Sequence, residues 1–177
     1  MQTRIPLFGF VISALIGCAN TGSVVERRPL GSPLGGYKSV AVIVAHADPS
    51  AKNAAKHVSS CKTALETTLN ASRVFGDVRG ESGQEGADVV MKWTIRGVKE
   101  SLDLQLVGNA GAARVELAME LVDPKSGPIA ELDVEGTSEK NTRSSINGID
   151  TDALEDTVKI ACENAGKHAY EYLAAHK

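Results

Sequence analysis

The stretch Val89-Val90-Met91-Lys92-Trp93-Thr94-Ile95-Arg96 decides the fold, because one set of alternate positions in it is uniformly apolar. The same alternation returns in Arg114–Leu121 (RVELAMEL) and in Glu131–Glu135 (ELDVE). A period of two with one polar side indicates strands that bury one face, which is typical of an antiparallel sheet. Leu102–Leu106 continues the alternation past Gly97, where a kink is expected in the strand that begins at Val89.

The flanking segments predict the remaining elements. Lys38–Ala45 (KSVAVIVA) is apolar on both faces, as a central strand should be. A helix is predicted from Asp48, as its N-cap, to about Ser72. The stripe that this helix from Asp48 to Ser72 buries contains Ala54, Val58, Cys61, Leu65 and Leu69. Farther along the chain, Asp123–Gly127 (DPKSG) has the composition of a hairpin loop between two strands.

A second long helix is predicted at the carboxyl end, after the polar segment Gly136–Gly148, which is expected to be a mobile loop. Asp152 and Glu155 stand at capping-box spacing near its start. With a short strand near Val74–Val78, the order becomes β-α-β-β-β-β-α. This order predicts an α+β two-layer sandwich, a mostly antiparallel sheet with two long helices on one face. The stripe that the helix at the carboxyl end buries contains Leu154, Val158, Ala161 or Cys162, Ala165, Ala169 and Tyr172.

The amino terminus has the pattern of an export signal. Arg4 precedes the apolar run Leu7–Ile16, which is far shorter than the roughly 20 residues that a membrane-spanning helix needs. Leu15-Ile16-Gly17-Cys18 then resembles the lipobox of bacterial lipoproteins, which implies cleavage after residue 17 and lipidation of Cys18. Because Ala19 rather than Asp follows the cysteine, the resemblance also implies sorting to the outer membrane.

The chain is therefore expected to comprise a signal peptide at 1–17, the lipidated Cys18 with a flexible tether at 18–36, and a single periplasmic domain at 37–177. The tether prediction comes from the Gly, Pro and Ser residues and the lack of an apolar period between Ala19 and Gly36. The formal net charge of −3 does not suggest a nucleic-acid-binding surface.

Two cysteines remain once Cys18 is assigned to lipidation. Cys61 and Cys162 both lie mid-helix, on or beside the buried stripes, and the expected compartment is oxidising. Two helices on one side of a sheet bring such positions within reach, so a disulfide between them is predicted. The alternative of two buried thiols stays open, because Ala161 competes with Cys162 for the inward position.

Three segments carry a family resemblance: Tyr37–Val42 (YKSVAV), Val107–Gly111 (VGNAG) and Val115–Gly127. Across about Tyr37–Leu173 the chain resembles a family of small proteobacterial lipoproteins defined by domain of unknown function 4410. Asn109 interrupts the glycine pattern of that family. The fold also resembles the small α/β domain of the curli-secretion lipoprotein and of the lipoprotein activators of peptidoglycan synthases. Neither resemblance implies catalytic residues.

Few residues suggest catalysis or metal binding. His46 and Asp48 follow the first strand, a usual place for sites in α/β folds. His57, His168 and His176 lack partners at metal-ligand spacing, so neither a metal nor a cofactor is predicted. Gly108-Asn109-Ala110-Gly111 lacks the Lys-Ser/Thr of a phosphate-binding loop and is better explained as a tight connection between strands.

These observations favour a non-enzymatic accessory or binding module of the cell envelope, anchored by its lipid at the periplasmic face of the outer membrane. The expected partner is another envelope component. The alternative is a small-ligand-binding or hydrolytic envelope protein with a site near His46. The wet face of the sheet is the predicted interaction surface, and a merely solvated face is an equal alternative. Its polar residues include Lys92, Arg96, Arg114, Glu116 and Glu120.

Overall fold

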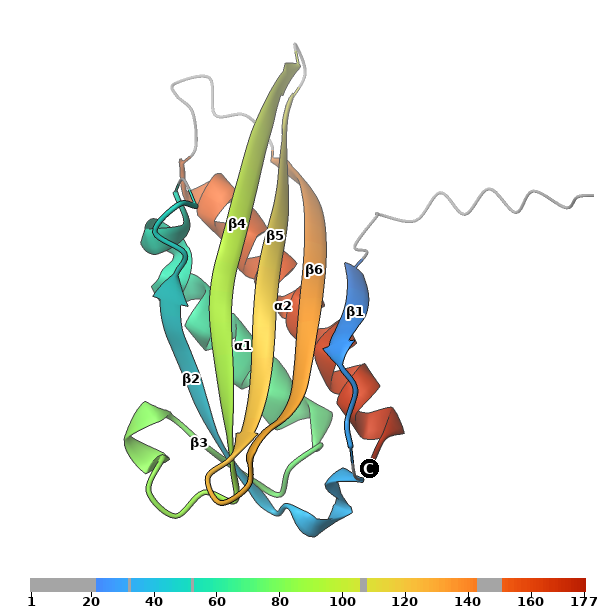
Figure 1. Ribbon diagram of the computed structural model, residues 1–177. Helices are drawn as coiled ribbons and strands as arrows, with labels where there is room; N and C mark the ends of the chain where they lie inside the picture. The colour runs from blue at the N-terminus through green and yellow to red at the C-terminus, as the bar shows by residue number, and fades with distance from the viewer. Residues whose placement is uncertain (1–21, 32, 52, 106–107, 143–150) are drawn as a thin grey trace, which may run out of the picture.

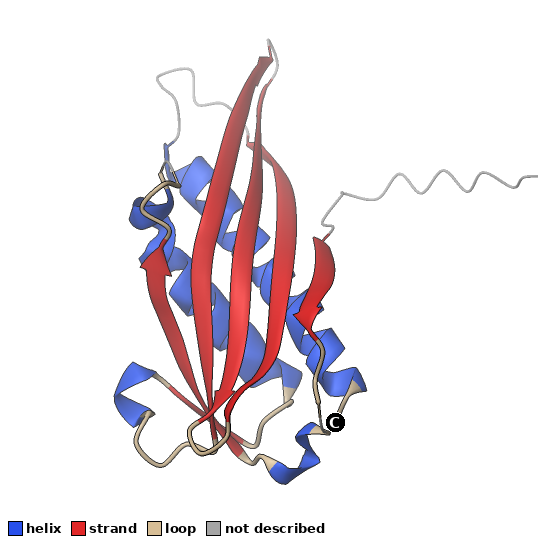
Figure 2. Ribbon diagram, viewed as in Figure 1, coloured by secondary structure: helices blue, strands red, loops and turns tan. Residues whose placement is uncertain are grey.

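A six-stranded mixed sheet with two helices on one face forms the protein (Figures 1 and 2). The computed structural model describes residues 22–31, 33–51, 53–105, 108–142 and 151–177. The sheet order is β1-β6-β5-β4-β2-β3, and the predicted α+β fold is confirmed. The strands are β1 Gly22–Arg28, β2 Ser39–Ala47, β3 Asp77–Arg79, β4 Val89–Gln105, β5 Gly108–Asp123 and β6 Gly127–Thr142, and the helices are α1 Val58–Ser72 and α2 Thr151–Ala175.

Strands β4, β5 and β6 form the predicted antiparallel meander. Trp93, Met119 and Leu132 lie side by side in it, each at most 1% exposed, because the alternate apolar positions all face the helices. The register of β4 shifts between Ile95 and Gly97, which is the kink expected from the sequence. The hairpin from β5 to β6 is also where it was predicted, and Asp123 Oδ1 accepts the Lys125 N–H at 2.8 Å within it.

Strand β2 is covered on both faces, as its apolar sequence predicted. Val42 belongs to the core beneath the helices, whereas Ala41 and Ile43, on the opposite face, are 0% and 7% exposed. The strand runs parallel to β3 and β4. Its start is held to the start of β4 by Asp88, whose Oδ2 accepts the N–H and O–H of Ser39 at 2.9 and 3.0 Å.

The predicted start of the first helix is wrong. Asp48 Oδ1 accepts the N–H and O–H of Ser50 at 2.9 and 2.6 Å, so this carboxylate closes a local turn and does not cap a helix. The short 3-10 helix Ala54–His57 follows, and α1 begins only at Val58. It ends at Ser72, as expected.

Two segments expected to be flexible contain strands. Within 18–36, residues Gly22–Arg28 form β1, which pairs antiparallel with β6. Leu34, farther along the same segment, is 1% exposed, and its N–H donates to the His176 carbonyl at 3.1 Å. Strand β6 provides an edge for β1, and Val24 packs against the core, so tertiary pairing overrides the loop-like composition.

The loop predicted for Gly136–Gly148 is likewise a strand over its first half, since β6 continues to Thr142. Residues 143–150 lie outside the described residues. Gly136 lets α2 pack directly on the strand, because a Cβ there would lie 2.0 Å from the Ala161 carbonyl oxygen. The glycine that suggested a loop in the sequence is a point of close contact between strand and helix.

The core lies between the sheet and the helices, and the two helices are joined within it. The predicted disulfide between Cys61 and Cys162 is present, with Cα atoms 5.3 Å apart and both residues fully buried. Tyr170 is also buried, packs edge-on against Trp93, and donates its hydroxyl to the Leu65 carbonyl at 3.0 Å. Tyr170 thus takes the buried place that the sequence analysis gave to Tyr172, which is only partly buried.

Candidate functional site

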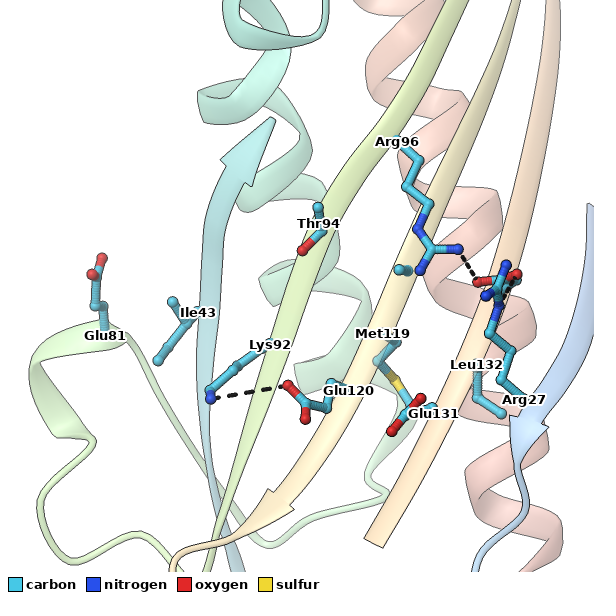
Figure 3. Close-up of a pocket in the computed structure, with 12 residues that line it drawn as sticks. Arg27, Ile43, Glu81, Lys92, Thr94, Arg96, Met119, Glu120, Glu131 and Leu132 are labelled. Carbon is cyan, nitrogen blue, oxygen red and sulfur yellow. Dashed lines mark hydrogen bonds and ion pairs between the residues drawn. The ribbon is translucent and has the colours of Figure 1, made fainter. Parts of the chain in front are cut away.

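The face of the sheet turned away from the helices is the candidate site, and we call it the open face. Its side chains come from the polar positions of β4, β5 and β6, with β1 at one border (Figure 3). All five residues predicted for this surface lie on it. The open face comprises Ser23, Val25, Arg27, Lys92, Thr94, Arg96, Arg114, Glu116, Ala118, Glu120, Glu131, Asp133 and Glu135.

Small side chains hollow the centre of the open face. Thr94 and Ala118 are paired across β4 and β5, while longer side chains stand around them. The resulting depression has a volume of about 650 Å³ and is open to solvent. Figure 3 shows Lys92 and Glu120 on one side of it and Arg96 reaching across β5 on the other.

Carboxylates occupy β5 and β6 in directly opposed pairs. Glu120 lies across from Glu131, and Glu116 lies across from Glu135, with Asp133 between the two pairs along β6. Like charges at such positions repel each other, so their arrangement requires nearby cations. Those cations come largely from the neighbouring strands, and Arg114 of β5 adds one more, with its Nη2 2.5 Å from Glu135 Oε2.

Asp133 connects the two cationic borders of the open face. Its Oδ1 lies 2.6 Å from Arg96 Nη1 of β4, and its Oδ2 lies 2.5 Å from Arg27 Nε of β1. Arg28 of β1 also pairs with Glu131 at 3.2 Å. Strand β1 is thus held to β6 by ion pairs as well as by backbone hydrogen bonds. These charged groups remain partly exposed, so they are available to exchange partners with another molecule.

Arg27, Glu131 and Asp133 also lie on this surface, although they are not among the five residues named for it from the sequence. Glu131 and Asp133 alternate with Leu132 and Val134, and this alternation already assigns them to the wet face. Arg27 carries no such signal, because its segment has the composition of a flexible tether. Only the pairing of β1 with β6 brings it to the open face.

A second group of charged side chains lies on the helix side of the sheet, where β4 meets the 3-10 helix that precedes α1. His57 is 4% exposed, and its Nε2 lies 2.9 Å from Glu100 Oε1. Lys56 Nζ lies 2.9 Å from the other oxygen of the same carboxylate. Burial lowers the pKa of His57, and the negative charge of Glu100 opposes that shift only in part. No sequence pattern linked these residues, because 43 positions separate His57 from Glu100.

The other candidate residues do not converge. His46 lies in β2, and its backbone pairs with Thr94 of β4, but its side chain lies outside what the structure describes. Cys18 lies entirely outside the described residues. Asp48 is engaged by Ser50, whose hydrogen bonds lower the pKa of Asp48. The remaining histidines make local contacts: His168 Nδ1 lies 3.7 Å from Glu171 Oε2, and His176 Nδ1 lies 2.8 Å from the Tyr172 carbonyl oxygen.

Within the described ranges, no three His, Cys, Asp or Glu residues are grouped to hold a metal ion. In the same part of the chain, no helix has both the length and the apolar character needed to cross a bilayer. The tight connection predicted for Gly108–Gly111 is wrong, because these residues lie within β5 and their backbone pairs with β4.

No family model matches the chain and no curated protein matches it, so the resemblance to domain of unknown function 4410 stays a prediction. Solved structures do show similarity. The PelC dodecamer of Paraburkholderia phytofirmans is 17% identical with a TM-score of 0.48, covering 84% of this chain and 96% of that chain. A candidate lipoprotein of Caulobacter crescentus CB15 is 16% identical with a TM-score of 0.48, covering 77% and 88%. Lipoprotein GNA1162 of Neisseria meningitidis is 13% identical with a TM-score of 0.36, covering 68% and 92%.

Proposed function

We propose that this protein is a lipid-anchored lipoprotein of the bacterial envelope that binds another envelope component through its open face, without catalysing a reaction. The observation that carries the proposal is the open face itself. Both long helices cover the opposite side of the sheet, which leaves a hollowed surface lined with charges of both signs. Interleaved guanidinium and carboxylate groups of this kind give orientation and specificity to a macromolecular contact.

The chemistry of the hollow supports binding over catalysis. Its lining includes neither His, nor Cys, nor Ser among the described residues, and Thr94 supplies its hydroxyl. Nucleophilic catalysis needs a nucleophile beside a base that activates it. The charges around Thr94 are instead paired with one another across the strands, as Lys92 is with Glu120 at 4.0 Å.

The anchor is the second part of the proposal and derives from the lipobox that ends at Cys18. Ala19 supports placement at the periplasmic face of the outer membrane. We expect Cys18→Ser to accumulate as an uncleaved precursor that incorporates no labelled fatty acid. A variant that is still acylated and cleaved would refute the anchor and leave the binding surface to be judged separately.

Charge reversal on the open face tests the binding role. Arg96→Glu and Glu120→Lys each reverse a charge beside the hollow, and Lys159→Glu on the exposed side of α2 is the matched control. After chemical crosslinking in cells, we expect the two open-face variants to lose an adduct that the wild type and the control retain. Identical adducts in all four proteins, at equal stability, would contradict a binding role for this face.

A further inference from the structure

We propose that the domain rests on the phospholipid bilayer by its β1 edge, so that the open face stands upright beside the membrane. We define the β1 edge as strand β1 with the neighbouring His168 and Glu171 of α2. The inference rests on the proposed lipidation of Cys18 and adds to it the orientation of the domain. It follows from the number of residues between the lipid and the first strand.

The chain allows little distance between the anchor and the sheet. Three residues, Ala19, Asn20 and Thr21, separate Cys18 from Gly22. Four steps of at most about 3.6 Å each let the Cα atoms of Cys18 and Gly22 lie no more than about 14 Å apart. An 18-residue tether would have allowed any orientation, whereas this short connection does not.

Gly22 is a fixed point of the fold. It pairs with Gly136 of β6, and a Cβ atom at position 22 would lie 2.1 Å from the His168 ring. The start of β1 is thus pressed between β6 and α2, and Figure 1 shows β1 at the border of the sheet beside α2. The bilayer surface must therefore pass close to this point.

In three orientations of the domain, Gly22 would lie too far from the bilayer surface for the short connection to the lipidated Cys18. If the β3 edge faced the bilayer, five strand spacings of about 4.8 Å would hold Gly22 about 24 Å away. If the Arg28 end of β1 pointed down, six residues at about 3.3 Å would hold it about 20 Å away. If the Gly22 end of β1 pointed down, the part of β5 from Val115 to Gly108 would lie between Gly22 and the bilayer. Val115 is beside Gly136, which pairs with Gly22, so this part of β5 would hold Gly22 about 23 Å away.

The two broad faces of the domain fit less well than the β1 edge. A helix layer against the bilayer would add roughly 15 Å, because helices pack about 10 Å from a sheet and have a radius of about 5 Å. The open face would bring five carboxylates and four basic groups against lipid phosphates, and because these groups already pair with one another it offers no net attraction. Val25, the one large hydrophobic side chain that is exposed among the described residues, at 59%, lies on β1 where the β1 edge borders the open face.

This orientation restricts the partner of the open face. The sheet is six strands wide, so every part of it lies within a few tens of ångströms of the bilayer surface. The partner is then a component that itself lies at the membrane surface, and its contacts run along the upright face of the sheet.

Site-specific quenching tests the orientation in the full lipidated protein. With Cys18 alkylated and Cys61 bonded to Cys162, one introduced cysteine is the only free thiol. An environment-sensitive fluorophore is attached to one introduced cysteine in each protein. The positions are Val25→Cys or Glu171→Cys at the β1 edge, Lys99→Cys on β4, and Asp77→Cys on β3. Each protein is reconstituted in vesicles of phosphatidylethanolamine and phosphatidylglycerol that contain a lipid with a nitroxide on its headgroup.

We expect the two edge positions to lose most of their emission, and positions 99 and 77 to keep most of theirs. Insertion of about 20 Gly and Ser residues between Thr21 and Gly22 should abolish the difference. Strongest quenching at position 99 or 77 in membrane-bound, acylated protein would overturn the orientation alone. Protein that carries no acyl group and remains off the vesicles would instead overturn the proposed anchor on which the orientation rests.

Discussion

Gly136 of β6 lies directly beneath Ala161 of α2, so close that a Cβ atom at position 136 would fall 2.0 Å from the Ala161 carbonyl oxygen. The same Cβ would lie 2.6 Å from the Ala165 nitrogen. Since both neighbours are helix backbone, they cannot move aside as a flexible side chain would. The spacing between the two layers is therefore set by the absence of a side chain at this position.

We predict that Gly136→Ala lowers the free energy of unfolding by at least about 1–3 kcal/mol, the usual cost of overpacking, because α2 must move away from β6. Gly97→Ala is the matched control in β4 of the same sheet, where the added Cβ would meet the Glu116 side chain at 3.5 Å. Urea unfolding of the lipid-free chain measures both. Equal midpoints for the two variants would contradict the close packing.

The disulfide between Cys61 and Cys162 closes a loop of 101 residues. On the chain-entropy model such a loop contributes about 4–5 kcal/mol, although measured values often fall below this. We expect the Cys61→Ala, Cys162→Ala double variant to unfold at markedly lower urea concentration than the wild type. Thiol titration of the unfolded, unreduced domain checks the bond directly, and two reactive thiols per chain would refute it.

His57 makes the stability of the protein depend on pH. Burial lowers the pKa of His57 in the folded state, so the unfolded state takes up its proton first as the pH falls. The folded state is then favoured fully above the unfolded pKa of about 6.5, and this contribution is lost as the pH falls from there through the lowered folded value. We predict that His57→Gln flattens the fall in stability below pH of about 6.5. A wild type and variant with parallel stability profiles would rule the contribution out.

Asp133 holds the edge strand β1 through Arg27 and also binds Arg96. Because exposed ion pairs contribute only about 0.2–1 kcal/mol each, Asp133→Asn should change global stability little. We expect its effect in native-state hydrogen exchange, where the amides of β1 should exchange faster than in the wild type. Glu116→Gln, which removes a carboxylate that pairs with Lys99 and Arg114, is the control and should leave β1 protected.

The sequence predicted the elements that follow a local period and failed where pairing between distant segments decides. The alternation around Trp93 and Leu117 gave the meander, the kink at Gly97 and the face on which each charge lies. The buried stripes of both helices placed Cys61 and Cys162 close enough for a bond. The periodicity behind each of these features can be seen within a single strand or helix, although the disulfide itself joins α1 to α2.

The features that were missed depend on a partner elsewhere in the chain. Strand β1 resembles a linker until β6 pairs with it, and Gly136 resembles a loop residue until α2 packs on it. Asp48 is a residue type that often caps helices, but in this structure its carboxylate accepts a hydrogen bond from the Ser50 hydroxyl instead. Tyr170 and Tyr172 stand two positions apart on α2, and only the place of Trp93 selects which of them is buried.

The most direct test of the binding role places a photo-crosslinking amino acid at Thr94, on the floor of the hollow, in living cells. The same amino acid at Thr63, on the exposed side of α1, is the matched control. We expect a discrete adduct with one envelope component from position 94 that is absent from position 63. No adduct from position 94, or the same adduct from both positions, would contradict the binding role.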